Sequence, residues 1–227
     1  MTTTSNTVKR TGSTRNSTRK LALLALFSAL ILLMAFTPFL GYIPLGFTRA
    51  TIIHIPVILG SLILGPAGGT VLGGVFGLTS LINNTVNPTA TSFVFSPFYS
   101  LGEFSGGFQS LLICFLPRIL TGVVPYYIHR VFQKFGGKEK RANGVLPLAA
   151  AGVSGALTNT LLVMGMIFLF FGKDYAIASG KAAGTAYLFI LSIIGINGVP
   201  EAIVAGILLV LLGKVLLNEK VRANIGV

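Results

Sequence analysis

Charged residues are scarce in this chain of 227 residues, acidic ones above all, and there is a single cysteine. Charged side chains make up 10% of the sequence, whereas a typical soluble domain has about 25%. Two long stretches, 50–102 and 142–172, contain no charged residue at all. A soluble domain of this size could not bury so much apolar sequence, and long apolar stretches are typical of membrane spans. The composition therefore excludes most soluble enzymes and DNA-binding domains.

The motifs of enzymes and metal sites are also missing from the sequence. There is no HExxH or G-x-S-x-G motif, no cluster of His and Cys, and no pair of carboxylates in one segment. Segment 65–70 lacks the lysine of a phosphate-binding loop. Cys114 lies in an apolar run and cannot form an internal disulfide. We expect no enzymatic activity, no cofactor, no bound metal and no ATP hydrolysis by this chain itself.

Apolar sequence, in contrast, is abundant: hydrophobic residues make up 53% of the chain and the mean hydropathy is +0.85. This pattern predicts an all-α integral membrane protein with six transmembrane helices. The helices are expected at residues 20–37, 50–65, 68–85, 107–133, 144–171 and 185–213. They form one domain, 20–217, between a flexible basic tail at 1–19 and a short tail at 218–227.

Two alternatives to this division stay open. The first apolar run could be a cleavable signal peptide, although no A-x-A-like cleavage site ends it. The short second and third helices are joined by the turn signal Gly65-Pro66-Ala67-Gly68-Gly69 and could form a re-entrant hairpin. Neither end of the chain would change sides in that second case.

The positions of the basic residues predict the orientation. Thirteen Lys and Arg residues lie in the N-terminal tail, in 130–141 and at the C-terminus, against three on the other side, Arg49, Lys173 and Lys181. Because basic loops accumulate in the cytoplasm, we expect a bacterial cell membrane protein with both termini cytoplasmic. The basic clusters can contact the anionic lipid bilayer, and we expect no nucleic-acid partner. Segment 86–106 then faces outward and is long enough to form a functional cap.

Small residues recur at helical spacing on two of the predicted helices. Gly69, Gly73 and Gly77 form one stripe, which we expect to pack against another helix of the same chain. Ala25 and Ala29 make the same four-residue step on the first helix. Either internal packing or the docking of a partner helix would explain that step.

A few polar residues interrupt the apolar spans. Arg118 lies about 16 Å from the outer end of the fourth helix, at 1.5 Å per residue, and Asn197 and Glu201 lie at comparable depth on the sixth. Ionisable residues so deep usually face a cavity or a partner, and Arg118 and Glu201 could simply neutralise each other.

Asparagines on three helices are expected to face a common cavity, because an amide in lipid lacks hydrogen-bond partners. They predict a polar pocket below the long loop. The expected pocket residues are Arg118, Asn83, Asn84, Asn159, Asn197 and Glu201, with Tyr99 and Phe98 as a lid and Arg49 and His54 near the mouth. His54 could equally be a core histidine.

Several stretches carry a resemblance to a known family. Segments Thr48–Pro56, Ser92–Glu103 and Pro117–Pro125, the basic tail, the six helices and the Ala25/Ala29 step are the relevant features. With them the chain resembles the substrate-capture (S) components of energy-coupling-factor (ECF) vitamin transporters. The three segments look most like the pantothenate-type S components of Gram-positive bacteria.

The resemblance implies a transport subunit that binds a water-soluble vitamin, with pantothenate as the best match, from outside. It implies as partners a transmembrane scaffold (T) subunit and two cytoplasmic ATPase subunits, with which the chain releases its cargo inward. Pantothenate has one carboxylate, for which Arg118 at pocket depth or Arg49 at the mouth is the candidate cation. Another vitamin such as folate, a stand-alone secondary transporter, and a membrane enzyme or assembly factor remain as alternatives.

Overall fold

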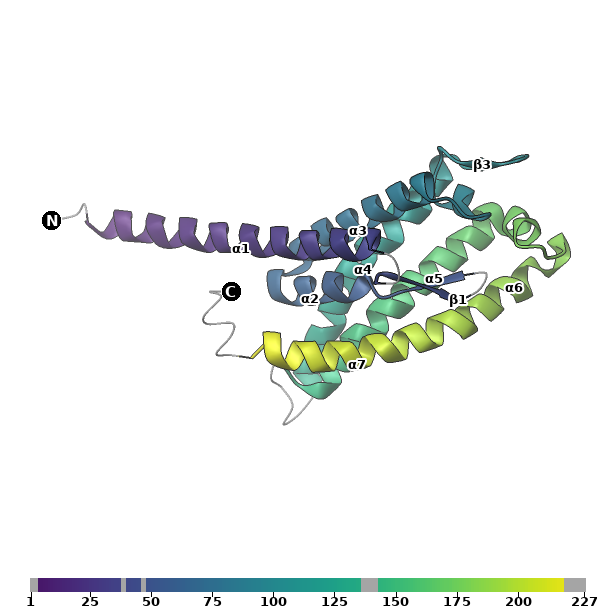
Figure 1. The fold of residues 1–227 in the computed structure, drawn as a ribbon. Coiled ribbons are helices and arrows are strands. Elements are labelled where there is room, and N and C mark those ends of the chain that lie inside the picture. The colour runs from purple at the N-terminus through teal and green to yellow at the C-terminus, as the bar shows by residue number, and fades with distance from the viewer. Residues whose placement is uncertain (1–3, 38–39, 46–47, 136–142, 219–227) are drawn as a thin grey trace.

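The computed structural model describes residues 4–37, 40–45, 48–135 and 143–218, without the side chains of 4–16, 42–45, 48–50 and 135. The molecule is a bundle of helices with two short β-hairpins in the connections (Figure 1). The helices are α1 (Thr4–Phe36), α2 (His54–Leu64), α3 (Pro66–Val86), α4 (Phe108–Phe135), α5 (Val145–Ala178), α6 (Ala186–Ile193) and α7 (Val199–Leu216). The shorter elements are β1 (Tyr42–Leu45), β2 (Thr48–Thr51), η1 (Ser92–Val94), β3 (Ser100–Leu101), β4 (Phe104–Ser105), η3 (Ala183–Thr185) and η4 (Ile194–Gly198).

Among the described residues, four segments are long and apolar enough to cross a membrane. They are Ser17–Phe36, Phe108–Lys134, Val145–Ala178 and Ala183–Leu216. α2 has 11 residues and is therefore about 16 Å long, roughly half the thickness of a bilayer core. α2 and α3 meet at Gly65, whose φ of 84° is in the left-handed region that favours glycine.

The first helix is longer than the sequence predicts. α1 begins at Thr4, inside the segment for which the composition predicts a flexible tail, and its N-terminal half projects beyond the other helices (Figure 1). The segment contains no proline, and extending a helix that the apolar residues have already nucleated costs little per residue. The basic segment therefore continues the helix of the first apolar run.

The last predicted helix consists of three pieces. α6 ends at Ile193, the π-helix η4 occupies Ile194–Gly198, and α7 begins at Val199. A π-helix carries an extra residue in its turn and is often found at functional sites. α5 runs seven residues beyond the predicted end, with non-helical φ and ψ at Phe171.

The glycine stripe packs as the sequence predicts. A Cβ atom added at Gly69 would meet the backbone oxygen of Gly122, and one added at Gly73 would meet the backbone oxygen of Arg118. Only glycine allows α3 and α4 to approach so closely. The backbone of α4 is therefore fixed against α3 at Arg118.

α2 lies inside the bundle and contacts α1, α3, α4 and α5. Its residues from His54 to Ile63 are all buried, and Val57 and Ile58 belong to the largest apolar core together with Phe76 of α3. A second apolar core forms where η1 meets α5 and α6, around Phe93, Ile167 and Ile190. Residues of both cores, Phe76 of the first and Val163 and Ile193 of the second, line one cavity.

Candidate functional site

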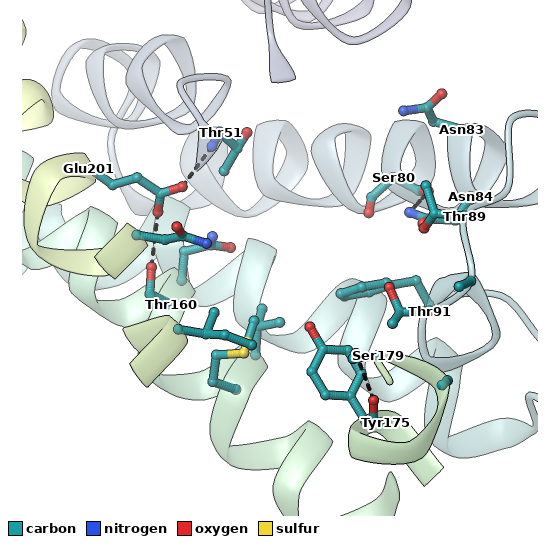
Figure 2. A pocket seen from close by; sticks show the side chains of 18 of the residues that line it. Thr51, Ser80, Asn83, Asn84, Thr89, Thr91, Thr160, Tyr175, Ser179 and Glu201 are labelled. Atoms are coloured by element: carbon teal, nitrogen blue, oxygen red, sulfur yellow. Dashed lines mark hydrogen bonds between the residues drawn. The ribbon is translucent and has the colours of Figure 1, made fainter. Parts of the chain in front are cut away.

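A cavity of about 690 Å³ opens between α3, α4, α5, η4 and α7, which is within the usual range of ligand pockets, about 300–1,000 Å³. Segment 89–95 contributes Thr89, Thr91 and Phe95 to its wall. Figure 2 shows Thr51, Thr160 and Glu201 at one end, and Ser80, Asn84, Thr89 and Thr91 at the other. The cavity therefore joins the end of β2, segment 89–95 and helices from α3 to α7.

Arg118 lines this cavity although its side chain is only 6% exposed. Pro117 has no N–H to donate to the carbonyl four residues before it, that of Ile113. The Nη1 of Arg118 donates to this carbonyl instead, at 2.7 Å. Pro117 thus leaves the Ile113 carbonyl without a backbone donor, and this carbonyl holds the Arg118 side chain in place.

Two aromatic rings and a hydroxyl complete the surroundings of this guanidinium. Its carbon lies 5.6 Å from the ring centroid of Phe76 and 5.2 Å from that of Phe95, which are cation–π distances. Its Nη2 donates a long hydrogen bond, 3.4 Å, to the Oγ of Ser80. The buried Nε has no acceptor among the described residues. A guanidinium has five N–H groups, so Arg118 keeps donors for a ligand.

Glu201 lies at the other end of the cavity, in the first turn of α7. Its Oε1 accepts from the backbone N–H of Thr51 at 2.7 Å, and its Oε2 accepts from the hydroxyl of Thr160 at 3.1 Å. Thr51 is the last residue of β2. The carboxylate therefore connects the β1–β2 hairpin to α5 and α7.

Arg118 and Glu201 do not form an ion pair in the part of the chain that the structure describes. The guanidinium bonds to Ile113 and Ser80, while the carboxylate bonds to Thr51 and Thr160. Direct neutralisation, the simpler interpretation of two buried charges, does not describe this arrangement. Both groups instead face the same cavity.

All four predicted asparagines line the cavity. Asn84 is held by its own surroundings, because its Nδ2 donates to the Ser80 carbonyl at 2.8 Å and its Oδ1 accepts from the Ser92 hydroxyl at 2.9 Å. It fixes segment 89–95 to α3. Asn159 differs, since its buried Oδ1 has no donor among the described residues. Asn83 and Asn197 are both buried.

Three of the other predicted site residues, Phe98, Tyr99 and His54, are not among the described residues that line the cavity. Phe98 is 78% exposed, and Tyr99 packs at the edge of the second apolar core. Neither residue lines the cavity in this structure, and Phe95 of the same segment lies beside Arg118. His54 is fully buried at the start of α2 rather than near the mouth. The side chain of Arg49, on β2, lies outside the described residues.

Several cavity residues carry no signal in the sequence. Phe76 and Phe95 are apolar and resemble any core residue. Tyr175 is buried, and Figure 2 shows its hydroxyl directed toward the middle of the cavity. Thr160 follows Asn159 directly, but consecutive helical residues point about 100° apart, so helical spacing from Asn159 does not identify it. No group of three or more His, Cys, Asp or Glu side chains gathers among the described residues.

Comparisons with known proteins point to one family. The family model "ECF transporter, substrate-specific component" matches residues 19–213. The chain is 37% identical over 189 residues to a protein of Lactococcus lactis named "Pantothenic acid transporter PanT", covering 82% of this chain and 88% of that protein. It is 30% identical over 214 residues to a protein of Leuconostoc mesenteroides named "Pantothenate transporter PanT", covering 92% of this chain and 98% of that protein.

Proposed function

The chain belongs to the family of substrate-specific components of ECF transporters, and we propose that it captures pantothenate. The sequence motifs already predicted this membrane transport family. The vitamin binds from outside the cell and enters with the help of a T subunit and two ATPase subunits. Two relatives carry pantothenate in their names, at 37% and 30% identity. The chain itself would supply the binding site and its partners the energy.

The observation that carries this proposal is the environment of Arg118. Its guanidinium is buried, is held by Ile113 and two rings, and has an Nε without an acceptor among the described residues, at the wall of a cavity. A planar guanidinium can hold a carboxylate with two parallel hydrogen bonds. Pantothenate has one carboxylate. Its amide and hydroxyl groups would face the neutral polar groups Asn83, Asn159, Asn197 and Tyr175.

Calorimetric titration of the purified chain with a panel of vitamins tests the proposal. We expect tight binding of pantothenate and none of folate. Arg118→Met should weaken pantothenate binding by about 2–5 kcal/mol, the usual loss for a buried charge-assisted contact, and Arg118→Lys should weaken it less. Thr158→Val is the matched control, because this hydroxyl donates to the Ser154 carbonyl within α5 and does not line the cavity.

The double variant Arg118→Met with Glu201→Met separates binding from charge balance. We expect it to fold and to lose the ligand. If it kept the affinity of the unmodified chain, Arg118 would not be the carboxylate partner, and Arg49 would take its place in the proposal. Binding of a different vitamin by the unmodified chain would overturn the assignment to pantothenate.

The proposal includes a topology of six passes with both termini in the cytoplasm, in which the 11-residue α2 crosses only part of the bilayer. Basic residues support it, because Lys134 lies in the last turn of α4 and Lys214 in the last turn of α7. A cysteine at Glu103, exposed beside the β3–β4 hairpin, should react with a membrane-impermeant reagent in whole cells, and one at Lys134 should not. Cys114 is buried, so the unmodified chain serves as the blank. Reversed labelling would refute the topology.

The T subunit is proposed to dock on α1. Ala25 and Ala29 are exposed, as are Leu26 and Leu30 beside them, so these small residues are accessible for close approach of a partner helix. Ala25→Leu with Ala29→Leu should abolish uptake in cells while the isolated chain still binds pantothenate. Leu30→Phe, at a position that is also exposed and lies about 100° around the helix from Ala29, is the control. Loss of binding as well would indicate internal packing.

A further inference from the structure

We propose that the cavity has a hydrogen-bond donor end at Arg118 and an acceptor end at Glu201 and Asn159. The acceptor end excludes ligands whose hydroxyl groups are phosphorylated. This inference rests on the proposed function. It concerns which form of the vitamin is taken and how the vitamin lies in the cavity. Its ligand class is a carboxylate that has free hydroxyl groups at the opposite end of the molecule.

The donor end is defined by unused N–H groups. Arg118 makes two hydrogen bonds, to Ile113 and Ser80, so three of its five N–H groups remain. One of them, on Nε, is buried and has no acceptor among the described residues. Donors without acceptors in a buried site are costly. A ligand carboxylate at this end would satisfy them.

The acceptor end is defined by unused lone pairs. The Glu201 carboxylate accepts from Thr51 and Thr160, one bond to each oxygen, and an ionised carboxylate has about four acceptor sites. Asn159 precedes Thr160 in α5, and its buried Oδ1 has no donor among the described residues. Both side chains are nine-tenths or more buried and line the cavity. Ligand hydroxyl groups would satisfy these acceptors.

The two ends are separated across the cavity. Ser80, which the guanidinium contacts, lies apart from the Glu201 carboxylate in Figure 2. The two charges are bonded to different partners. A ligand that entered in the reverse orientation would place its carboxylate against Glu201. Like charges brought together in a site cost several kcal/mol, so only one orientation is favourable.

The same repulsion discriminates against phosphorylation. A phosphate on the terminal hydroxyl would replace a donor by a group with nearly two negative charges and only acceptor oxygens. At the Glu201 end it would meet a carboxylate and an amide oxygen. The cavity would therefore accept the free vitamin and reject its phosphorylated form, the form that a kinase reaction would produce from it.

Calorimetric competition on the full chain in detergent tests this with three probes. They are pantothenate, pantothenol (a hydroxymethyl group replaces the carboxylate) and pantothenate phosphorylated on its terminal hydroxyl. For the unmodified chain we expect both altered ligands to bind at least about 100-fold more weakly than pantothenate. Two affinity ratios are compared: pantothenate to pantothenol (the pantothenol ratio) and pantothenate to phosphorylated pantothenate (the phosphate ratio). Neither ratio depends on a variant's overall affinity.

Two variants should change different ratios. Glu201→Gln should lower the discrimination against the phosphorylated ligand at least about tenfold and leave the pantothenol ratio within about twofold. Arg118→Lys should reduce the pantothenol ratio and leave the phosphate ratio. Should Glu201→Gln not fold, Asn159→Asp places a new negative charge at the same end and should raise the phosphate discrimination. Thermal unfolding in detergent reports folding of each variant.

The outcomes separate the two proposals. If the unmodified chain does not bind pantothenate, the proposed function is wrong and this inference falls with it. If it binds pantothenate but Glu201→Gln and Asn159→Asp leave the phosphate ratio unchanged, or if they change the pantothenol ratio instead, only the inference is overturned. Equal binding of free and phosphorylated pantothenate by the unmodified chain would overturn it directly.

Discussion

The two charged residues of the cavity are supported in different ways. Arg118 belongs to a stretch of α4 whose backbone lies against α3. The contact is so close at Gly73 that a Cβ atom there would meet the backbone oxygen of Arg118. Glu201 is held through its side chain, by one hydrogen bond to the backbone of the β1–β2 hairpin and one to Thr160. Packed backbones cannot separate by a fraction of an ångström without losing many contacts, whereas a single hydrogen bond contributes about 1 kcal/mol.

The difference assigns a role to each side of the cavity. We expect the Arg118 side to keep its shape whether or not a ligand is present, so that the carboxylate site is preorganised. On the Glu201 side α7 is also packed on α5, since a Cβ atom at Gly152 would meet the backbone oxygen of Ala205. The contact of the carboxylate with Thr51, in contrast, is a single hydrogen bond, and its loss would cost about 1 kcal/mol.

The largest effect that tests this comparison is expected at Gly73. Gly73→Leu would force α3 and α4 apart at Arg118, since a side chain at Gly73 meets the backbone of α4, which cannot rotate away. Overpacking typically costs about 1–3 kcal/mol, and we expect the upper end here together with loss of pantothenate binding. Thermal unfolding in detergent and calorimetry measure the two effects.

Gly74→Leu is the matched control for that substitution. Nothing lies within 4 Å of a Cβ atom at Gly74, so the same side chain on the neighbouring residue should change stability and binding little. Equal effects of Gly73→Leu and Gly74→Leu would show that the effect of leucine does not come from contact with α4. The rigid character of the Arg118 side would then be refuted.

A smaller effect is expected at Thr160. Thr160→Val keeps the shape of the side chain but removes the donor to Glu201. One hydrogen bond is worth about 1 kcal/mol, so pantothenate affinity should fall about fivefold while the fold is kept. Calorimetry beside the Thr158→Val control measures it. A loss as large as that of Arg118→Met would mean that the Glu201 side is as preorganised as the Arg118 side.

The sequence predicted the polar residues of the site better than its aromatic ones. Arg118, Glu201 and Asn159 stand out because a charge or an amide inside an apolar run needs a cavity or a partner. All three line the cavity. Phe95 was missed in favour of Phe98 because segment 86–106 has no regular period that would show which side chains turn inward.

The helices were predicted more closely than their interruptions. The ends of α3 and α4 lie within two residues of the predicted ones, since glycine, proline and charge mark them. The π-helix η4 was not predicted, because the segment from Ala186 to Leu216 is apolar on nearly all sides and offers no polar face whose rotation would reveal an extra residue. The helical start at Thr4 was missed because composition alone describes that segment as solvated.

The extra residue in η4 acts as a phase shift in the chain. Each residue of an α-helix advances the side-chain direction by about 100°, and the wider turn of η4 takes up one residue more. Rewinding Ile194–Gly198 as a regular helix with every residue kept would therefore rotate all of α7 by roughly that angle. Glu201 would turn away from Thr51, and outward-facing residues such as Ile203 and Ile207 would turn toward α5. The width of this turn therefore sets which face of α7 meets the cavity.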